Sequence, residues 1–232
     1  MTAQTPHLDF DEPDGLAARG TVVVLPGRGE RPGLYARFGR RLAADAYRVR
    51  VAGDATADLE AVSAQVKGLV ADAVAPVVLA GSDTGALLAR YLVASGAVSA
   101  DALVLAGLPG SRTIVNEEVE LRASCPTHQK LLRAGEHVEL GALRAERIPP
   151  VLREPVPPLA VPALGLHGEN DFVSPYAEVA GDYAGARVSF VDDGRHDVLN
   201  SAHHRSVAAT VVLFLEELRA ERPPITGAGD VR

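Results

Sequence analysis

The sequence has no tryptophan, a single cysteine and few aromatic residues of any kind. Phe, Trp and Tyr together make up 4% of the 232 residues, although 47% of the chain is hydrophobic. The lone Cys125 cannot form an internal disulfide, and one cysteine cannot build a zinc site. The interior must therefore consist mainly of Ala, Val and Leu.

The 23 basic residues are outnumbered by 30 acidic ones, and no long apolar run is present. The formal net charge is -7, with Lys and Arg scattered along the chain, so we expect no nucleic acid partner. No run approaches the ~20 apolar residues needed to cross a bilayer, and the first residues lack the basic start and apolar stretch of a secretion signal. We therefore expect a cytoplasmic protein without a membrane partner. The sequence makes no prediction of its oligomeric state.

Short β-branched runs alternate with longer helical patterns, which predicts an α/β fold with a mostly parallel sheet and helices on both faces. We predict one domain over residues 1–222, followed by a disordered tail at 223–232. Strands are expected at 21–25, 48–51, 76–80, 102–106, 163–166 and 187–191. Helices are expected at 37–46, 58–74, 84–95, 175–183 and 202–220.

The alternation fails in the middle of the chain, where we predict a short helical lid inserted at about 111–160. Two helical stretches, at 116–124 and 127–134, lie within it and are followed by a proline-rich segment. Five apolar residues could form a roof over a substrate site: Leu121, Leu131, Leu132, Val138 and Leu143. The insertion thus predicts a small, mainly apolar substrate.

The most informative motif is a turn flanked by glycines. In VVLAGSDTGALL (residues 77–88), Asp83 lies between Gly81 and Gly85, after a buried strand and before a helix. The motif resembles the nucleophile elbow of the α/β-hydrolase family, G-x-nucleophile-x-G, with Asp where most members have Ser. Glycines are required because larger side chains would collide where strand and helix cross. The alternative interpretation is an ordinary helix N-cap.

Three other segments agree with this resemblance. The turn LPGRG (residues 25–29) corresponds to the turn that supplies an oxyanion-hole donor, so the resemblance implies that the backbone N–H groups of Arg28, which follows Gly27, and of Thr84 form that hole. The stretch LGLHGENDFVSP (residues 164–175) places Asp171 as the triad acid. The loop before the last helix places His196 as the base.

Aspartate at an elbow suits attack on saturated carbon, because attack on an acyl group would leave an unstable anhydride. The alkyl ester formed would be hydrolysed by water that His196 activates. This is the logic of the epoxide hydrolases and haloalkane dehalogenases, which the elbow resembles. The resemblance to these two groups ends there, because Thr84 stands where a dehalogenase has Trp and residues 111–158 contain no Tyr that could open an epoxide.

We therefore predict a hydrolase that acts on a small molecule through an Asp83-His196-Asp171 triad and needs neither metal nor cofactor. No His and carboxylate spacing resembles a metal motif, and no phosphate loop follows the first strand. Two alternatives stay open. The chain could be a carboxylic ester hydrolase that uses Ser82, or a non-hydrolytic base catalyst or ligand-binding protein on the hydrolase scaffold.

Overall fold

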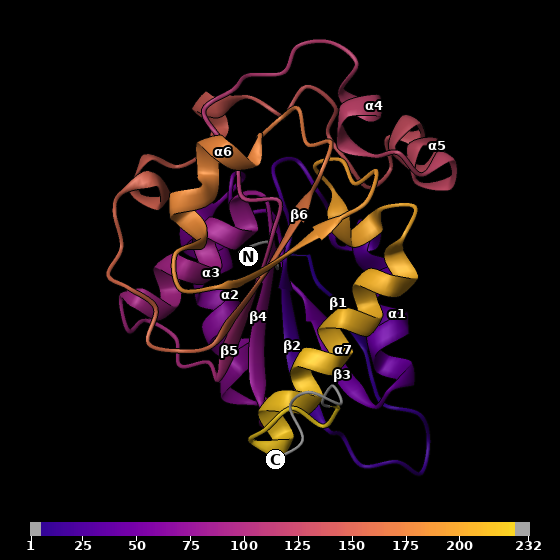
Figure 1. Ribbon diagram of the computed structural model, residues 1–232, viewed down its shortest axis with the longest axis vertical. Helices are drawn as coiled ribbons and strands as arrows, with labels where there is room; N and C mark the ends of the chain where they lie inside the picture. The colour runs from indigo at the N-terminus through magenta and orange to yellow at the C-terminus, as the bar shows by residue number, and fades with distance from the viewer. Residues whose placement is uncertain (1–5, 226–232) are drawn as a thin grey trace, which may run out of the picture.

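The computed structural model describes residues 6–225, and its centre is a seven-stranded sheet (Figure 1). In space the strand order is β1-β3-β2-β4-β5-β6-β7. Only β1 is antiparallel to its neighbour, and every other adjacent pair is parallel. The strands are β1 (Leu8–Phe10), β2 (Gly20–Leu25), β3 (Tyr47–Val51), β4 (Val77–Ser82), β5 (Ala102–Ala106), β6 (Ala163–Gly168) and β7 (Arg187–Val191).

Burial explains which strands the sequence predicts well. Every residue of β2, β4, β5 and β6 is buried, as expected for central parallel strands that are covered on both faces. β3 alternates between buried and half-buried residues, while β1 is a three-residue edge strand with no buried residue. The sequence pattern did not predict β1, because three residues are too few to show a periodicity.

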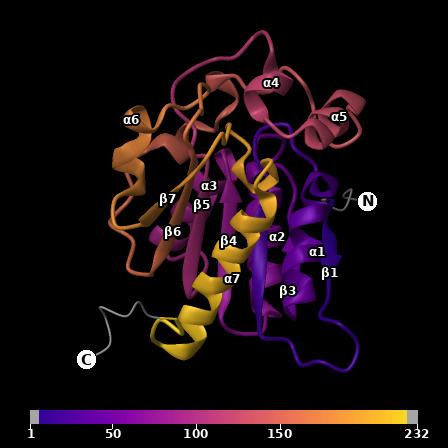
Figure 2. The ribbon, with the colours of Figure 1, turned by 45° about the vertical axis from the view of Figure 1, so that its right-hand side comes forward.

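Helices cover both faces of the sheet. One face packs against α1 (Ala36–Ala44) and α7 (His204–Ala220), and the other against α2 (Leu59–Ala71) and α3 (Thr84–Ala94), as Figures 1 and 2 show. Each face has its own apolar cluster. Phe38 and Val211 belong to the first cluster, and Val66 and Leu88 belong to the second.

Residues 111–160, called here the 111–160 segment, join β5 to β6 and lie across one end of the sheet (Figure 2). The segment contains the short helices α4 (Glu118–Arg122) and α5 (Pro126–Ala134) and the 3-10 turns η2 (Ala145–Arg147) and η3 (Pro150–Arg153). The helix predicted at 116–124 is therefore shorter than expected. An isolated antiparallel bridge between Glu30 and Val138 ties the segment to the loop after β2.

The remaining elements are short: η1 (Pro32–Tyr35), α6 (Tyr176–Val179), η4 (Ala180–Tyr183) and η5 (Val198–Asn200). Of the predicted tail at 223–232, residues 226–232 lie outside the described part of the chain. Across residues 6–225 no helix is long and apolar enough to cross a bilayer. The same residues contain no group of three or more His, Cys, Asp or Glu side chains that could hold a metal ion.

Candidate functional site

Asp83 occupies a strained backbone position between β4 and α3. Its φ is 50° and its ψ is -121°, a conformation that non-glycine residues rarely adopt. The backbone N–H of Asp83 donates to the Ala106 carbonyl oxygen at 2.9 Å, which fixes the turn against β5. The Asp83 side chain makes no capping hydrogen bond to α3, although the residue stands at the N-cap position. The N-cap interpretation of the motif is therefore wrong.

The flanking glycines have no room for a side chain. A Cβ added at Gly81 would lie 2.3 Å from the Gly85 carbonyl oxygen, and one added at Gly85 would lie 2.0 Å from the Leu25 carbonyl oxygen. A Cβ at Gly27 would lie 2.9 Å from the Cβ of Asp83. Contacts this short cannot exist, so strand, helix and turn can approach only with glycine at these positions.

Three residues that are distant in the sequence meet beside this turn. His196, in the loop after β7, lies with Nε2 3.0 Å from Asp83 Oδ1 and Nδ1 2.8 Å from Asp171 Oδ2. Asp171, in the loop after β6, is held in turn by the Ser174 backbone N–H, which donates to its Oδ1 at 2.8 Å. The predicted base thus lies within hydrogen-bond reach of both predicted carboxylates. All three residues are buried.

The side chain of Arg28 is the main feature that sequence reasoning missed. As the resemblance implied, the Arg28 backbone N–H points at the site, but it donates to Asp83 Oδ2 at 2.9 Å. The guanidinium adds two parallel hydrogen bonds, from Nε to Oδ2 at 2.9 Å and from Nη2 to Oδ1 at 2.8 Å. The Thr84 hydroxyl lies 3.2 Å from Oδ2. The signal in the sequence is an Arg directly after Gly27, in the turn that the resemblance places next to the elbow.

These contacts fix the charge of both central groups. Burial would raise the pKa of Asp83, but Arg28 and His196 outweigh it and hold this pKa well below its usual range. Burial would likewise lower the pKa of His196, but Asp171 and Asp83 raise it to about 10. At neutral pH the site therefore holds a carboxylate beside an imidazolium. An ionised carboxylate with so low a pKa is a weak base, which speaks against a base role for Asp83.

The cover over the site is ionic, whereas the sequence predicted an apolar roof. The fully buried Arg122 of α4 donates to Glu30 at 2.7 Å and to the Arg28 carbonyl oxygen at 2.9 Å, while Arg28 Nη1 donates to the Arg144 carbonyl oxygen at 2.9 Å. Burial, with Asp197 nearby, raises the pKa of Glu30 to about 7 against the effect of Arg122. Two of the predicted roof residues, Leu132 and Val138, pack in the apolar cluster that contains Leu34 instead.

Ser82, the alternative nucleophile, ends β4 and is buried. Its hydroxyl hydrogen-bonds Tyr35, and this contact acts to lower the pKa of the Tyr35 hydroxyl, against burial and the nearby carboxylates, which raise it well above 10. Ser82 has an ordinary strand position, so the strained backbone of the turn belongs to Asp83 alone. Both ring nitrogens of His196 have carboxylate partners, Asp171 and Asp83, and within the described residues no hydrogen bond joins Ser82 to His196.

Two further histidines lie near the triad, and no motif in the sequence indicates their roles. His167 Nε2 lies 3.7 Å from Asp171 Oδ2, and its Nδ1 is 3.1 Å from the Tyr183 hydroxyl. Burial lowers the pKa of His167 despite Asp171, which favours the neutral ring. His128 of α5 pairs with Asp197 at 2.5 Å. His128 and Asp197 are 69 residues apart, so their pairing depends on the folded arrangement and leaves no local pattern in the sequence.

Sequence comparison finds no matching family model and no matching curated relative. Solved structures are similar in fold. A monoacylglycerol lipase from Paleococcus ferrophilus matches 93% of this chain and 100% of its own at a TM-score of 0.69 and 13% identity. A monoglyceride lipase from Saccharomyces cerevisiae matches 91% of this chain and 91% of its own, with a TM-score of 0.72 and 12% sequence identity. The chain has the α/β-hydrolase fold.

An enol-lactonase from Burkholderia xenovorans is also similar, over 91% of this chain and 96% of its own, with a TM-score of 0.65 and 17% identity. The structural similarity establishes the α/β-hydrolase fold, and sequence identities this low carry no information on the activity. The predicted fold class is thus confirmed. The turn that carries Asp83 and the loops that carry Asp171 and His196 follow strands β4, β6 and β7 of that fold.

Proposed function

We propose that this protein is a hydrolase in which Asp83 is the nucleophile, His196 the base and Asp171 the residue that orients it. The observation that carries the proposal is the pair of contacts on one strained carboxylate: His196 Nε2 at 3.0 Å from Oδ1 and the Arg28 backbone N–H at 2.9 Å from Oδ2. One oxygen faces the base, and the other lies where an oxyanion would form. Such a division suits a carboxylate that is first alkylated and then hydrolysed.

In the first step, Asp83 Oδ1 attacks a saturated carbon of the substrate. A C–O bond forms, the bond to the leaving group breaks, and the leaving group departs with the electron pair. Esterification removes the negative charge of Asp83, which is one of the two charges that raise the pKa of His196. The imidazolium can then release its proton to the leaving group or to solvent. The reaction itself thus generates the neutral base that the second step requires.

In the second step, neutral His196 takes a proton from water, which attacks the Asp83 carboxyl carbon. Negative charge develops on Oδ2, where the Arg28 backbone N–H and the Thr84 hydroxyl donate. The ester bond to Oδ1 then breaks, and the alcohol leaves with the proton from His196. Asp83 is regenerated with one oxygen from water, while Asp171 stabilises the imidazolium in between.

Access to the carboxylate requires movement of Arg28, because Asp83 is only 1% exposed and Arg28 is fully buried. The guanidinium is tied to the 111–160 segment through the Arg144 carbonyl oxygen. Substrate entry would therefore displace both together. The same ion pair favours a second candidate function, a ligand-binding or non-hydrolytic protein in which Asp83 is a structural partner of Arg28. Turnover experiments separate the two.

The first experiment tests wild type, Asp83→Asn and Ser82→Ala against epoxides, alkyl halides, carboxylic esters and lactones. We expect turnover of an epoxide or alkyl halide by wild type and Ser82→Ala, and a loss of at least about 1,000-fold in Asp83→Asn. Ester hydrolysis that survives Asp83→Asn but disappears in Ser82→Ala would instead support the Ser82 esterase. Absence of turnover over the whole panel would favour the ligand-binding protein.

The second experiment separates nucleophile from base. His196→Gln should still permit attack by Asp83 but block ester hydrolysis, so a covalent adduct should accumulate on the peptide that contains Asp83. The matched control is the double variant Asp83→Asn/His196→Gln, in which no adduct should form. Mass spectrometry of digested protein reports both results.

A further inference from the structure

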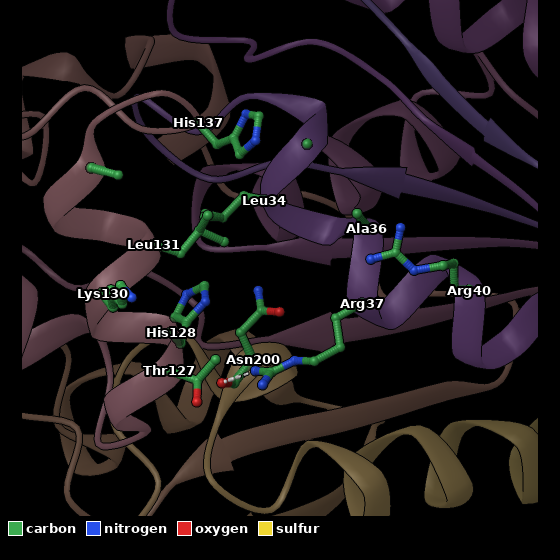
Figure 3. A pocket seen from close by; sticks show the side chains of 12 residues that line it. Leu34, Ala36, Arg37, Arg40, Thr127, His128, Lys130, Leu131, His137 and Asn200 are labelled. Atoms are coloured by element: carbon green, nitrogen blue, oxygen red, sulfur yellow. Dashed lines mark hydrogen bonds between the residues drawn. The ribbon is translucent and has the colours of Figure 1, made fainter.

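An open cavity lies apart from the triad, between α1 and α5 (Figure 3). Its volume is about 580 Å³, within the range of small-molecule sites. Leu34, His128 and Asn200 form a buried floor, and the exposed Arg40, Thr127 and Lys130 form part of the rim. None of the three triad residues lines this cavity.

Positive charge without a counterion distinguishes this cavity. Arg37, Arg40 and Lys130 all line it, and no carboxylate does. Within residues 6–225 none of these three side chains forms an ion pair: Arg37 donates to the Asn200 carbonyl oxygen at 2.6 Å and contacts Cys125 Sγ at 3.8 Å, and Arg40 lies over the Phe10 ring. Three uncompensated cations around one hollow, in a protein of net charge -7, attract an anion.

The floor adds a buried acceptor. Asn200 is fully buried, and its Nδ2 donates to Asp197 at 3.3 Å, which fixes the orientation of the amide. The other amide atom, Oδ1, has no hydrogen-bond partner among the described residues. In Figure 3 the Asn200 side chain lies between His128 and Arg37, at the cavity. A buried acceptor without a donor is costly, so a ligand that occupies this cavity should bring an O–H or N–H group.

Apolar side chains form much of the remaining lining, with Leu131, Ala36 and Ala134 on the walls and Leu34 in the floor, while His137 is a further polar residue. We propose that this cavity binds a small organic anion, a carboxylate or a phosphate monoester, that carries a short apolar chain and a hydroxyl beside the charged group. Arg37 holds the anionic group and Asn200 accepts from the hydroxyl, since these two residues are already in contact. Arg40 and Lys130 supply long-range attraction from the rim.

Isothermal titration calorimetry with α-hydroxyhexanoate, its neutral amide, hexanoate and hexyl phosphate tests the proposal. We expect the hydroxy acid to bind at least tenfold more tightly than its amide and about fivefold more tightly than hexanoate. A tighter affinity for hexyl phosphate than for hexanoate would identify a phosphate monoester as the ligand class, and the reverse a carboxylate. Failure of every anion to bind at millimolar concentration overturns the proposal.

Charge variants of the exposed rim residues test the electrostatic part of the proposal, and a variant of a neighbouring arginine is the matched control. Arg40→Gln and Lys130→Gln should each weaken binding about threefold to fivefold. Arg41→Gln removes the same charge from the next residue of α1, which lines a different hollow, and should change affinity less than about twofold. Equal losses in Arg40→Gln and Arg41→Gln would show that the attraction is non-specific and would contradict the site. Equal affinity for the acid and its amide would show that the cavity does not recognise the negative charge and would also contradict it.

Asn200→Ala tests the hydroxyl contact through a ratio. The preference for hydroxyhexanoate over hexanoate should fall to about one, while affinity for hexanoate itself persists. If Asn200→Ala does not fold, the rim variants still decide the question. Binding should be unchanged in Asp83→Asn, so this proposal can fail or succeed independently of the proposed hydrolase activity.

Discussion

Arg28 and Arg37 are both arginines near the 111–160 segment, but their surroundings are opposite. Arg28 is fully buried and forms a bidentate ion pair with Asp83. Arg37 lies beside a cavity with only neutral acceptors, the Asn200 carbonyl oxygen and Cys125 Sγ. The first charge is balanced by folding alone, whereas the second is balanced only when an anion binds. The site around Asp83, called here the closed site, is buried and its charges are paired. The cavity beside Arg37 is open to solvent, and its charges are unpaired.

Removing the charge of Arg28 and of Arg37 in separate variants shows how much each contributes to the free energy of unfolding. Arg28→Met should lower the free energy of unfolding by about 3 to 5 kcal/mol, because it leaves the buried Asp83 carboxylate without its main partner. Arg37→Met should cost about 1 kcal/mol or less, because the lost hydrogen bond is partly offset by relief of repulsion from Arg40 and Lys130. Urea unfolding of both variants measures the difference.

A double variant tests whether the cost of Arg28→Met comes from the unpaired Asp83 carboxylate. Asp83→Asn placed on Arg28→Met should restore part of the lost stability, since the unpaired charge is then removed. Equal costs for Arg28→Met and Arg37→Met would mean that the Arg28–Asp83 pair contributes no more than a surface contact. The surroundings of Arg28 and Arg37 would then differ in structure but not in their contribution to the free energy of unfolding.

Close packing at the closed site gives the next largest effect. Gly85→Ala should destabilise the protein by more than about 3 kcal/mol or prevent folding, since its Cβ would lie 2.0 Å from the Leu25 carbonyl oxygen. Gly68→Ala, in α2, is the matched control: nothing lies within 4 Å of its added Cβ, and it should stabilise by up to about 1 kcal/mol. A Gly85→Ala protein with wild-type stability would contradict the tight crossing of β4 and α3.

The charge state of His196 gives an effect that depends on pH. Its pKa is raised in the folded protein to about 10, so its contribution to stability is complete below the unfolded value near 6.5 and is lost as pH rises toward 10. Across that window, wild type should lose up to about 1.4 kcal/mol of unfolding free energy per pH unit more than His196→Gln loses. NMR should show no titration of the His196 ring between about pH 5 and 8. A midpoint near pH 6.5 would show that Asp83 and Asp171 do not stabilise the charged form of the His196 ring.

The smallest expected effect is a new activity in the closed site. Asp83→Ser should gain slow hydrolysis of a small activated ester, since the serine inherits His196, Asp171 and the Arg28 N–H, and each oxyanion donor is worth about 3 kcal/mol. Adding His196→Ala to this variant should abolish the gain. A folded Asp83→Ser protein that hydrolyses no acetate or butyrate ester would argue that the turn at Asp83 has only a structural role.

The sequence predicts those features whose cause is local. Buried runs such as 77–82 and the glycines around Asp83 follow from short-range sterics, and the order of three turns brought Asp83, Asp171 and His196 to one place. The Arg28 guanidinium, the His128–Asp197 pair and the cavity beside α1 were not predicted. Each depends on where side chains from distant segments meet, and a single arginine in a turn has the same appearance whether it faces solvent or a carboxylate.

A single turnover in water labelled with heavy oxygen shows whether Asp83 forms a covalent ester. With excess enzyme and a substrate identified by the screen, one labelled oxygen should enter the Asp83 carboxylate, and the alcohol product should carry none. Mass spectrometry of the Asp83 peptide measures the label, and Asp83→Asn is the control. Label in the product alone, with none in Asp83, would show that water attacks the substrate directly and would contradict the nucleophilic role of Asp83.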